Sequence, residues 1–503
     1  MPHYFKILSV LFFSASISNL NAAVTLPNFF SNNMVLQRGE KIAVWGNASK
    51  GERVTVTLGV NRSETITGSD GKWMVKLKPM RAGGPYTLNI TGDNSIEFSN
   101  VLLGDVWICA GQSNMELPVR RVKDSKKEIE SADYPQIRLF TVDHSANAES
   151  TRDNVDGEWL MCNPVTVDRF SAVAYFFGRE LYKEINVPIG LIDVGWNATR
   201  IEAWTSKEAL MRVDAGKKEV EAYPAIGKIS DENGLINYNA QMLEYQKAVA
   251  SGDSTKAKPN LFRPMSRDPY AISSLYNYMI YPFTSYPIKG VIWYQGEANS
   301  KSKQNAIDYR QFLPNMISSW REDWNQGNFP FLFVQLPNFE SELFWPDMRE
   351  SMLQTYLADK NTGMAVTIDI GMEKDIHPWN KQDVGYRLSL QALDIAYKQK
   401  DMVSQGPIFT SMKVENSEAI LSFNHIGSGL QSSVKELVGF KIAGLDKRFY
   451  DASASIVNGK VVVYSSFVKE PVAVRYGWEN NPTCSLFNKE KLPASPFRTD
   501  KWD

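Results

Sequence analysis

The chain has 503 residues, of which 43% are hydrophobic and 12% aromatic, so it can bury the cores of about two to four domains and is neither disordered nor fibrous. Its 55 basic and 56 acidic residues are mixed along the chain and leave a formal net charge of -1. This balance does not favour a polyanionic partner such as nucleic acid. A small neutral or weakly charged substrate agrees better with this charge balance.

The first residues have the anatomy of a secretory signal peptide. Lys6 precedes the apolar run 7–17, and small residues follow around Ala22 and Ala23. We expect cleavage near Ala22, which gives a signal peptide over 1–22 and export to the periplasm or the exterior. No later stretch reaches the roughly 20 apolar residues of a spanning helix, so no membrane span is expected.

The next segment, 23–100, alternates short β-rich runs with turns such as Ser69-Asp70-Gly71. Four runs carry the pattern: 42–46, 54–58, 73–77 and 86–90. Short strands at this spacing predict a small all-β sandwich. It carries no chemistry of its own.

Residues 101–401 have a different sequence pattern, in which short apolar runs alternate with longer amphipathic stretches. This alternation predicts an α/β domain with a parallel sheet between helices. Within it, 205–270 is polar, lacks a strand signal and predicts a mostly helical insertion near the site, as a lid or a substrate wall. β-runs return over 402–503 and predict a C-terminal all-β module.

The three cysteines are odd in number and far apart, which argues against a disulfide framework. Cys109 is expected to be a buried strand residue. A bridge between Cys162 and Cys484 stays open as an alternative.

An apolar run over 104–110 leads into Gly111-Gln112-Ser113-Asn114-Met115. The run places the Ser113 hydroxyl at the carboxyl end of a strand, where open α/β sheets carry their chemistry. Serine is a weak nucleophile that needs a histidine base. Met115 occupies the position of the second glycine of G-x-S-x-G, so a serine-esterase fold other than the α/β-hydrolase fold is favoured.

His377 is the candidate base, because it follows Asp375 by two residues and precedes a helical pattern. Asp375 is expected to hold the imidazole in the proton-accepting tautomer and to stabilise the imidazolium. Asp369 or a backbone carbonyl is the alternative orienting group. Leader, surface or packing positions are expected for the other histidines: His3, His144 and His425.

Three separated blocks, 111–115, 293–299 and 375–378, resemble the ordered sequence blocks of the sialate O-acetylesterase family, within the SGNH-hydrolase superfamily. Segments 31–38 and 201–204 extend the resemblance over nearly the whole mature chain. The resemblance implies a flavodoxin-like three-layer α/β/α SGNH-hydrolase domain flanked by all-β sandwich modules. It also implies removal of O-acetyl groups from sugars through an acetyl-serine intermediate, with no metal or cofactor.

The resemblance also assigns the donors that stabilise the tetrahedral oxyanion. The Ser113 backbone N–H is the first, and the Gln295 side-chain amide is another, although an ordinary buried amide is the alternative for Gln295. The family usually shows Trp-Gly-Gly-Thr in the middle block, where this chain places Asn197 in the donor position. An asparagine backbone N–H can still donate there, and Gly195 is the fallback.

Four side chains in or beside the motifs are candidate substrate contacts: Gln112, Trp293, Glu297 and Arg200. For Glu297, a second role is favoured over substrate contact: it accepts hydrogen bonds from the turns that hold Ser113 and Gln295. Arg200 or Arg387 could pair with a sialic acid carboxylate, with a structural ion pair as the alternative. Four aromatic residues lie in or beside the motifs, and for each we expect either stacking on a sugar ring or packing in the core: Trp204, Trp293, Tyr294 and Trp379.

Two other function classes compete with the esterase. A non-catalytic glycan-binding protein has little reason to keep serine, aspartate and histidine together. A glycosidase that uses Glu297 with Glu116 leaves Ser113 and His377 without a role. No pair of histidines or cysteines is spaced for zinc, and no phosphate-binding glycine motif occurs, so no metal or cofactor is expected. The sequence leaves open the choice between sialic acid and acetylated plant polysaccharide, and the oligomeric state.

Overall fold

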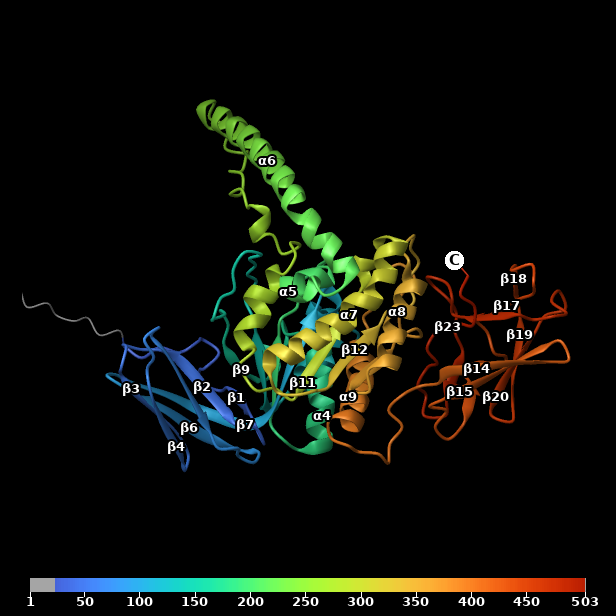
Figure 1. Ribbon diagram of the computed structural model, residues 1–503, viewed down its shortest axis with the longest axis horizontal. Helices are drawn as coiled ribbons and strands as arrows, with labels where there is room; N and C mark the ends of the chain where they lie inside the picture. The colour runs from blue at the N-terminus through green and yellow to red at the C-terminus, as the bar shows by residue number, and fades with distance from the viewer. Residues whose placement is uncertain (1–22, 503) are drawn as a thin grey trace, which may run out of the picture.

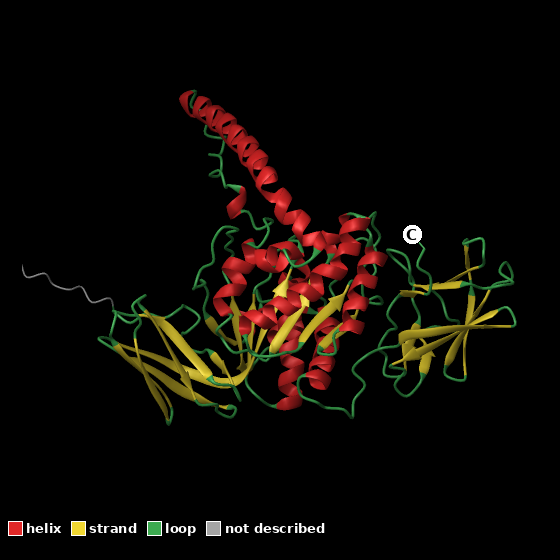
Figure 2. Cartoon of the chain, in the orientation of Figure 1, coloured by secondary structure: helices red, strands yellow, loops and turns green. Residues whose placement is uncertain are grey.

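A computed structural model describes residues 23–502 of the chain. The predicted signal peptide, 1–22, lies outside the described residues. The described part forms a row of three units, with an α/β unit between two β-modules (Figure 1). Helices gather in the central unit, and the outer units are built of strands and loops (Figure 2). No helix within 23–502 is long and apolar enough to cross a membrane.

The N-terminal module is made mainly of short antiparallel strands. β3 pairs with β4 and β6, and β2 pairs with β5. In β5 the buried side chains are Trp73, Val75 and Leu77, which alternate with exposed residues and therefore share the inner face. The bounds are β1 (Val35–Gln37), β2 (Ile42–Asn47), β3 (Arg53–Leu58), β4 (Asn61–Ile66), β5 (Lys72–Leu77) and β6 (Gly83–Thr91).

One long strand, β7 (Ser95–Gly111), joins this module to the central unit. Its first half pairs with β6, and its second half pairs with β10 and β11 of the parallel sheet. Burial alternates up to Asn100 and is continuous from Val101 onward, as expected where a strand enters a sheet covered on both faces. The predicted domain boundary at 100/101 therefore lies inside a single strand.

The central sheet has the order β13-β12-β11-β7-β10-β8-β9. All neighbouring pairs are parallel except β8 with β9 at the edge. The mixed α/β class with additional β-modules is thereby confirmed. The strands are β8 (Tyr134–Thr141), β9 (Trp159–Cys162), β10 (Ile189–Asp193), β11 (Gly290–Tyr294), β12 (Phe331–Gln335) and β13 (Thr362–Val366).

Two helix pairs cover the sheet. α4 (Ala172–Ile185) packs on α9 (Lys381–Ile395), and α7 (Lys303–Trp324) packs on α8 (Trp345–Ala358). α4 also contacts β8 and β10, whereas α8 contacts β12 and β13. The short helices are α1 (Ser113–Glu116), η1 (Val119–Arg121), α2 (Ser125–Glu130), α3 (Pro164–Val167), η2 (Ile201–Trp204), η4 (Tyr276–Ile280), η5 (Tyr281–Phe283) and η6 (Glu297–Lys301).

The 205–270 segment contains α5 (Lys207–Leu210), α6 (Asp214–Ala250) and η3 (Met265–Arg267). α6 has 37 residues, few of which are buried, and it projects away from the central unit (Figure 1). The chain returns beside α6, where the Met265 N–H donates to Asp231 Oδ1 at 2.6 Å. The insertion is thus a helical arm with a return strap over 258–267.

The C-terminal module has two four-stranded sheets, β14-β15-β20-β19 and β18-β17-β21-β23, around a core of its own. The buried Arg349 of α8 fixes it to the central unit by donating to the carbonyls of Glu479 and Asn480 at 2.7 and 2.8 Å. The bounds are β14 (Ile408–Glu415), β15 (Glu418–Asn424), β16 (Leu430–Ser432), β17 (Phe440–Ala443), β18 (Phe449–Asp451), β19 (Ser453–Val457), β20 (Lys460–Tyr464), β21 (Ala473–Tyr476), β22 (Leu486–Asn488) and β23 (Phe497–Arg498).

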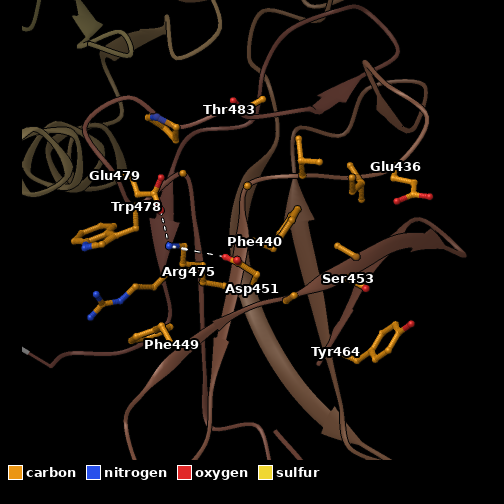
Figure 3. A pocket seen from close by; sticks show the side chains of 18 of the residues that line it. Glu436, Phe440, Phe449, Asp451, Ser453, Tyr464, Arg475, Trp478, Glu479 and Thr483 are labelled. Atoms are coloured by element: carbon orange, nitrogen blue, oxygen red, sulfur yellow. Dashed lines mark ion pairs between the residues drawn. The ribbon is translucent and has the colours of Figure 1, made fainter. Parts of the chain in front are cut away.

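A cavity of about 1130 Å³ lies in this module (Figure 3). Lys441 forms ion pairs there with Glu479 and Asp451. The ring of Trp478 is covered by the guanidinium groups of Arg475 and Arg498. None of the predicted site residues lines this cavity, so it is separate from the candidate active site.

All three cysteines are free thiols in the structure. Cys109 is buried in β7, and the bridge considered between Cys162 and Cys484 is not formed.

Candidate active site

The candidate nucleophile follows a turn that requires glycine. Gly111 ends β7 with φ of +146°, and a Cβ there would lie 2.1 Å from the Tyr294 carbonyl oxygen. This close approach presses the end of β7 against the end of β11, where the Gln112 N–H donates to the same carbonyl at 3.0 Å. Ser113 then begins α1. Its backbone N–H has no acceptor within the helix and is available to a ligand.

The structure brings His377 to this serine. The imidazole Nε2 lies 2.8 Å from Ser113 Oγ, within hydrogen-bond distance for a base and its nucleophile. His377 lies between β13 and α9, at the same edge of the sheet. Burial, followed by the charge of Lys381, lowers the pKa of His377 from its ordinary value of 6.5. The imidazole is therefore neutral at pH 7 and can accept the serine proton.

The carboxylate nearest to this imidazole belongs to Asp375. Its Oδ1 lies 3.8 Å from His377 Nδ1, too far for a hydrogen bond, and accepts the His377 backbone N–H at 2.8 Å. The alternative orienting group, Asp369, is bound by the two terminal nitrogens of the Arg387 guanidinium at 2.6 and 2.7 Å. Asp375, and not Asp369, therefore faces His377.

The predicted oxyanion donors of the middle block are occupied. The Asn197 backbone N–H is directed at the Glu116 carboxylate, and the Gly195 N–H donates to Asp193 Oδ1 at 3.1 Å. Burial is the main cause that raises the pKa of Glu116. The Asn197 N–H thus already faces an anion beside Ser113, whereas Gly195 is committed to the sheet.

Gln295 requires a correction. Its side chain is fully buried, and Nε2 donates to the Thr199 carbonyl at 3.1 Å and to Asn299 Oδ1 at 2.8 Å. Its Oε1 accepts from the Tyr309 hydroxyl at 2.8 Å. Because both amide hydrogens are used, Gln295 braces the floor of the site and has no free donor for an oxyanion.

Trp293 also requires correction as a substrate contact. It is 1% exposed and donates from Nε1 to the Tyr309 hydroxyl. Trp204 and Tyr294 are buried as well, whereas Trp379 is 52% exposed. Of the four motif aromatics, only Trp379 is open to a sugar.

The remaining predicted contacts hold the site together from within. Gln112 is buried and accepts the Ala298 N–H at 3.2 Å. Arg200 forms ion pairs with Glu202 and Glu219. Arg200 is therefore structural, as Arg387 is through its pair with Asp369.

Glu297 is 3% exposed and accepts a hydrogen bond from Asn114 Nδ2 at 2.5 Å. The prediction that it binds the serine turn agrees with this contact. A carboxylate buried behind the serine does not reach a sugar, so the arrangement argues against a glycosidase that uses Glu297.

Sequence reasoning missed Lys381. It is fully buried, and its Nζ donates to Asn114 Oδ1 at 2.6 Å. Burial lowers the pKa of Lys381 to about 7. Its place four residues after His377 is visible in the sequence, but a lysine at the start of a polar helix ordinarily faces solvent.

The second missed feature is a wall beside the serine. His144 stacks on Trp196 with ring centroids 4.1 Å apart, and His144 Nε2 lies 3.4 Å from Glu116 Oε1. Beyond this wall is a cavity of about 1330 Å³, which His144 and Trp196 line together with the return strap of the helical arm. Nothing near His144 in the sequence signals this position.

Comparisons with known proteins agree with the motifs. The family model for carbohydrate esterases, sialic acid-specific acetylesterase, matches residues 265–390. The sialate O-acetylesterase of Rattus norvegicus is 30% identical over 531 residues, covering 93% of each chain, and that of Mus musculus is 29% identical over 527 residues with the same coverage. A crystal structure of a carbohydrate acetylesterase from Xanthomonas citri superposes with a TM-score of 0.81 at 36% identity, covering 95% of this chain and all of that one.

Proposed function

The chain belongs to the sialic acid-specific acetylesterase family of carbohydrate esterases, and we propose that it removes O-acetyl groups from sugars with Ser113 as the nucleophile. It is a carboxylic-ester hydrolase by this membership. The observation that carries the role of the serine is the 2.8 Å contact between Ser113 Oγ and His377 Nε2 at the carboxyl ends of β7 and β11.

In the proposed first step, Ser113 Oγ attacks the acetyl carbonyl while His377 Nε2 takes the hydroxyl proton. The C–O bond to the sugar then breaks, and the imidazolium returns the proton to the departing sugar hydroxyl. In the second step His377 takes a proton from water, whose oxygen attacks the acetyl-serine carbonyl; the bond from that carbon to Ser113 Oγ then breaks, acetate leaves, and the imidazolium returns its proton to Ser113 Oγ. Asp375 stabilises the imidazolium in both steps by its charge, at 3.8 Å from Nδ1.

Two backbone N–H groups are the proposed oxyanion donors. The Ser113 N–H lies at the start of α1, where the helix itself offers no acceptor, and the Asn197 N–H faces the Glu116 carboxylate. The Glu116 side chain is 34% exposed and can rotate away when the acetyl group enters. The oxyanion then takes the place of the Glu116 carboxylate at the Asn197 N–H. This donor is thus already oriented for a negative charge before the reaction begins.

The cavity behind Trp196 supports a glycan substrate longer than one sugar. Its volume of about 1330 Å³ exceeds the range of about 300–1,000 Å³ that is common for small-ligand pockets. The return strap contributes Lys258 and Arg263 to its lining. We therefore place the chain that carries the acetylated sugar between Trp196 and the strap.

The decisive experiment measures acetate release by the mature protein from 9-O-acetylated sialic acid and from acetylated xylan, beside Ser113→Ala. Loss of release in the variant supports the proposed nucleophile, and the better substrate identifies the sugar class. Release that persists in Ser113→Ala would show that another group attacks. Absence of release from both substrates would favour a glycan-binding protein.

Two finer expectations belong to the same proposal. The order β10-β7-β11-β12-β13 supports a flavodoxin-like core to which β8 and β9 are added. Export through cleavage near Ala22 is supported by the residue pattern alone. Determination of the N-terminal residue of the protein recovered from the exporting cell checks it.

A further inference from the structure

Behind the Ser113–His377 pair lies a buried polar cluster of Asn114, Glu297 and Lys381. Asn114 is fully buried, Glu297 is 3% exposed and Lys381 is fully buried. Ions removed from water are costly unless they are paired and hydrogen-bonded. Such a cluster directly beneath a nucleophile therefore needs a reason beyond packing.

Asn114 is the centre of the cluster, and its amide has one possible orientation. Its Oδ1 accepts from Lys381 Nζ at 2.6 Å, and a lysine ammonium can only donate. Its Nδ2 donates to the Ile376 carbonyl at 2.9 Å, which can only accept, and to Glu297 Oε1 at 2.5 Å. The orientation of the Asn114 amide therefore fixes the donor and the acceptor in each of these hydrogen bonds.

These bonds reach both members of the reactive pair. Asn114 follows Ser113 in the chain, and Ile376 precedes His377. Asp375 holds the backbone N–H of His377 at 2.8 Å, while Asn114 holds the carbonyl of the preceding residue. Since Nδ1 of the imidazole has no direct carboxylate bond, these two backbone contacts fix where the ring lies.

We propose that Asn114, Glu297 and Lys381 are positioning residues, which hold His377 against Ser113, and that the Lys381 cation keeps His377 in its neutral, proton-accepting form. This inference rests on the function proposed above and adds to it the groups that prepare the base.

The charges around His377 give the sign of the effect. Lys381 and Arg121 lower the pKa of His377, as burial does, and Asp375 raises it. Lys381 itself faces Glu297 and Asp375, which oppose the effect of burial on its pKa, and lies 5.0 Å from the centre of the Tyr294 ring. With a pKa of about 7, Lys381 is charged over the acidic range in which His377 titrates. Its removal therefore raises the pKa of His377.

The test is the pH dependence of kcat/KM for a small acetyl ester, 4-nitrophenyl acetate, in Lys381→Met. We expect the acidic limb to move to higher pH and kcat to fall about 10- to 100-fold, with little change in KM, because the base is misplaced. Lys381→Arg keeps the charge and is expected to keep the acidic limb near its wild-type position. A purely structural role would lower activity at all pH values without moving the limb.

Lys289→Met is the matched control. Lys289 lies 5.0 Å from the centre of the Tyr397 ring, the same relation that Lys381 has to Tyr294, but at the opposite end of β11. The kcat of Lys289→Met and the acidic limb of its kcat/KM profile are expected to equal those of the wild type.

An acidic limb in folded Lys381→Met that coincides with the wild-type limb would overturn the proposal. Should that variant fail to fold, Lys381→Met combined with Glu297→Gln removes both ionisable groups that hydrogen-bond Asn114, and its limb is subject to the same criterion. Failure of the proposed function is seen separately, as wild-type hydrolysis that survives in Ser113→Ala.

Discussion

Asp375 touches His377 through the backbone, because Oδ1 accepts the His377 N–H at 2.8 Å and lies 3.8 Å from the ring Nδ1. The aspartate therefore sets the shape of the loop and supplies charge, whereas the direct ring hydrogen bond of a serine-protease triad is not made. This relationship separates the two tasks that such an aspartate usually performs together.

Asp375→Asn is expected to lower kcat about 10- to 100-fold, less than the roughly 10⁴-fold loss seen where the ring hydrogen bond is direct. Because Asp375 raises the pKa of His377, its removal moves the acidic limb of kcat/KM to lower pH. The shift is opposite in sign to that expected for Lys381→Met. Profiles of both variants on one ester measure it, and two shifts of the same sign would contradict this account of the charges.

Gln295→Ala is expected to lower stability and not only the rate. The substitution removes a hydrogen-bond partner from the Thr199 carbonyl, Asn299 and the Tyr309 hydroxyl, and each buried group left unpaired costs about 1–3 kcal/mol. Urea unfolding provides the free energy. Unchanged stability together with a kcat reduced by two to three orders of magnitude would instead identify Gln295 as an oxyanion donor.

Gly111→Ala is expected to inactivate the protein, because the new methyl group would lie 2.1 Å from the Tyr294 carbonyl oxygen at φ of +146°. The backbone has to shift where Ser113 begins, and strain of this kind costs about 1–3 kcal/mol. Gly327→Ala is a suitable control, since its φ is +76° but no atom lies within 4 Å of the new Cβ. Equal activity in the two variants would show that the contact with β11 does not position the serine.

Trp196→Ala is expected to raise KM for an acetylated oligosaccharide about 2- to 10-fold, as the loss of an aromatic contact implies. Hydrolysis of 4-nitrophenyl acetate, which carries no glycan to occupy the cavity behind Trp196, should keep its KM. Steady-state kinetics on the two substrates separate the effects. Equal changes on both would place Trp196 in support of the serine loop and not in glycan binding.

The α/β class and the neighbourhood of Ser113 and His377 could be predicted because they depend on local pattern. Strands of a parallel sheet are apolar throughout, and side chains that follow their carboxyl ends meet at one edge. The serine and histidine blocks each follow such a strand, β7 and β13.

Side-chain roles were less predictable because they depend on burial. From its place in the motifs, Trp293 is expected to stack on a sugar and Arg200 to pair with a carboxylate of the substrate. In the structure Trp293 lies in the core, and Arg200 forms an ion pair with Glu202. Lys381 gives the opposite case, a residue typical of surfaces that lies under the active site. Such placements come from segments far apart in sequence, which no local pattern describes.

The continuous strand β7 also affects how the enzyme can be divided. A chain shortened to begin at Val101 would keep the nucleophile but lose β1 and β6, the partners of β7 at Leu102 and Leu103. It would expose an unpaired, apolar edge directly connected to the serine turn, and such edges promote aggregation. The N-terminal module therefore has to be produced together with the catalytic unit, because both share the strand that leads to Ser113.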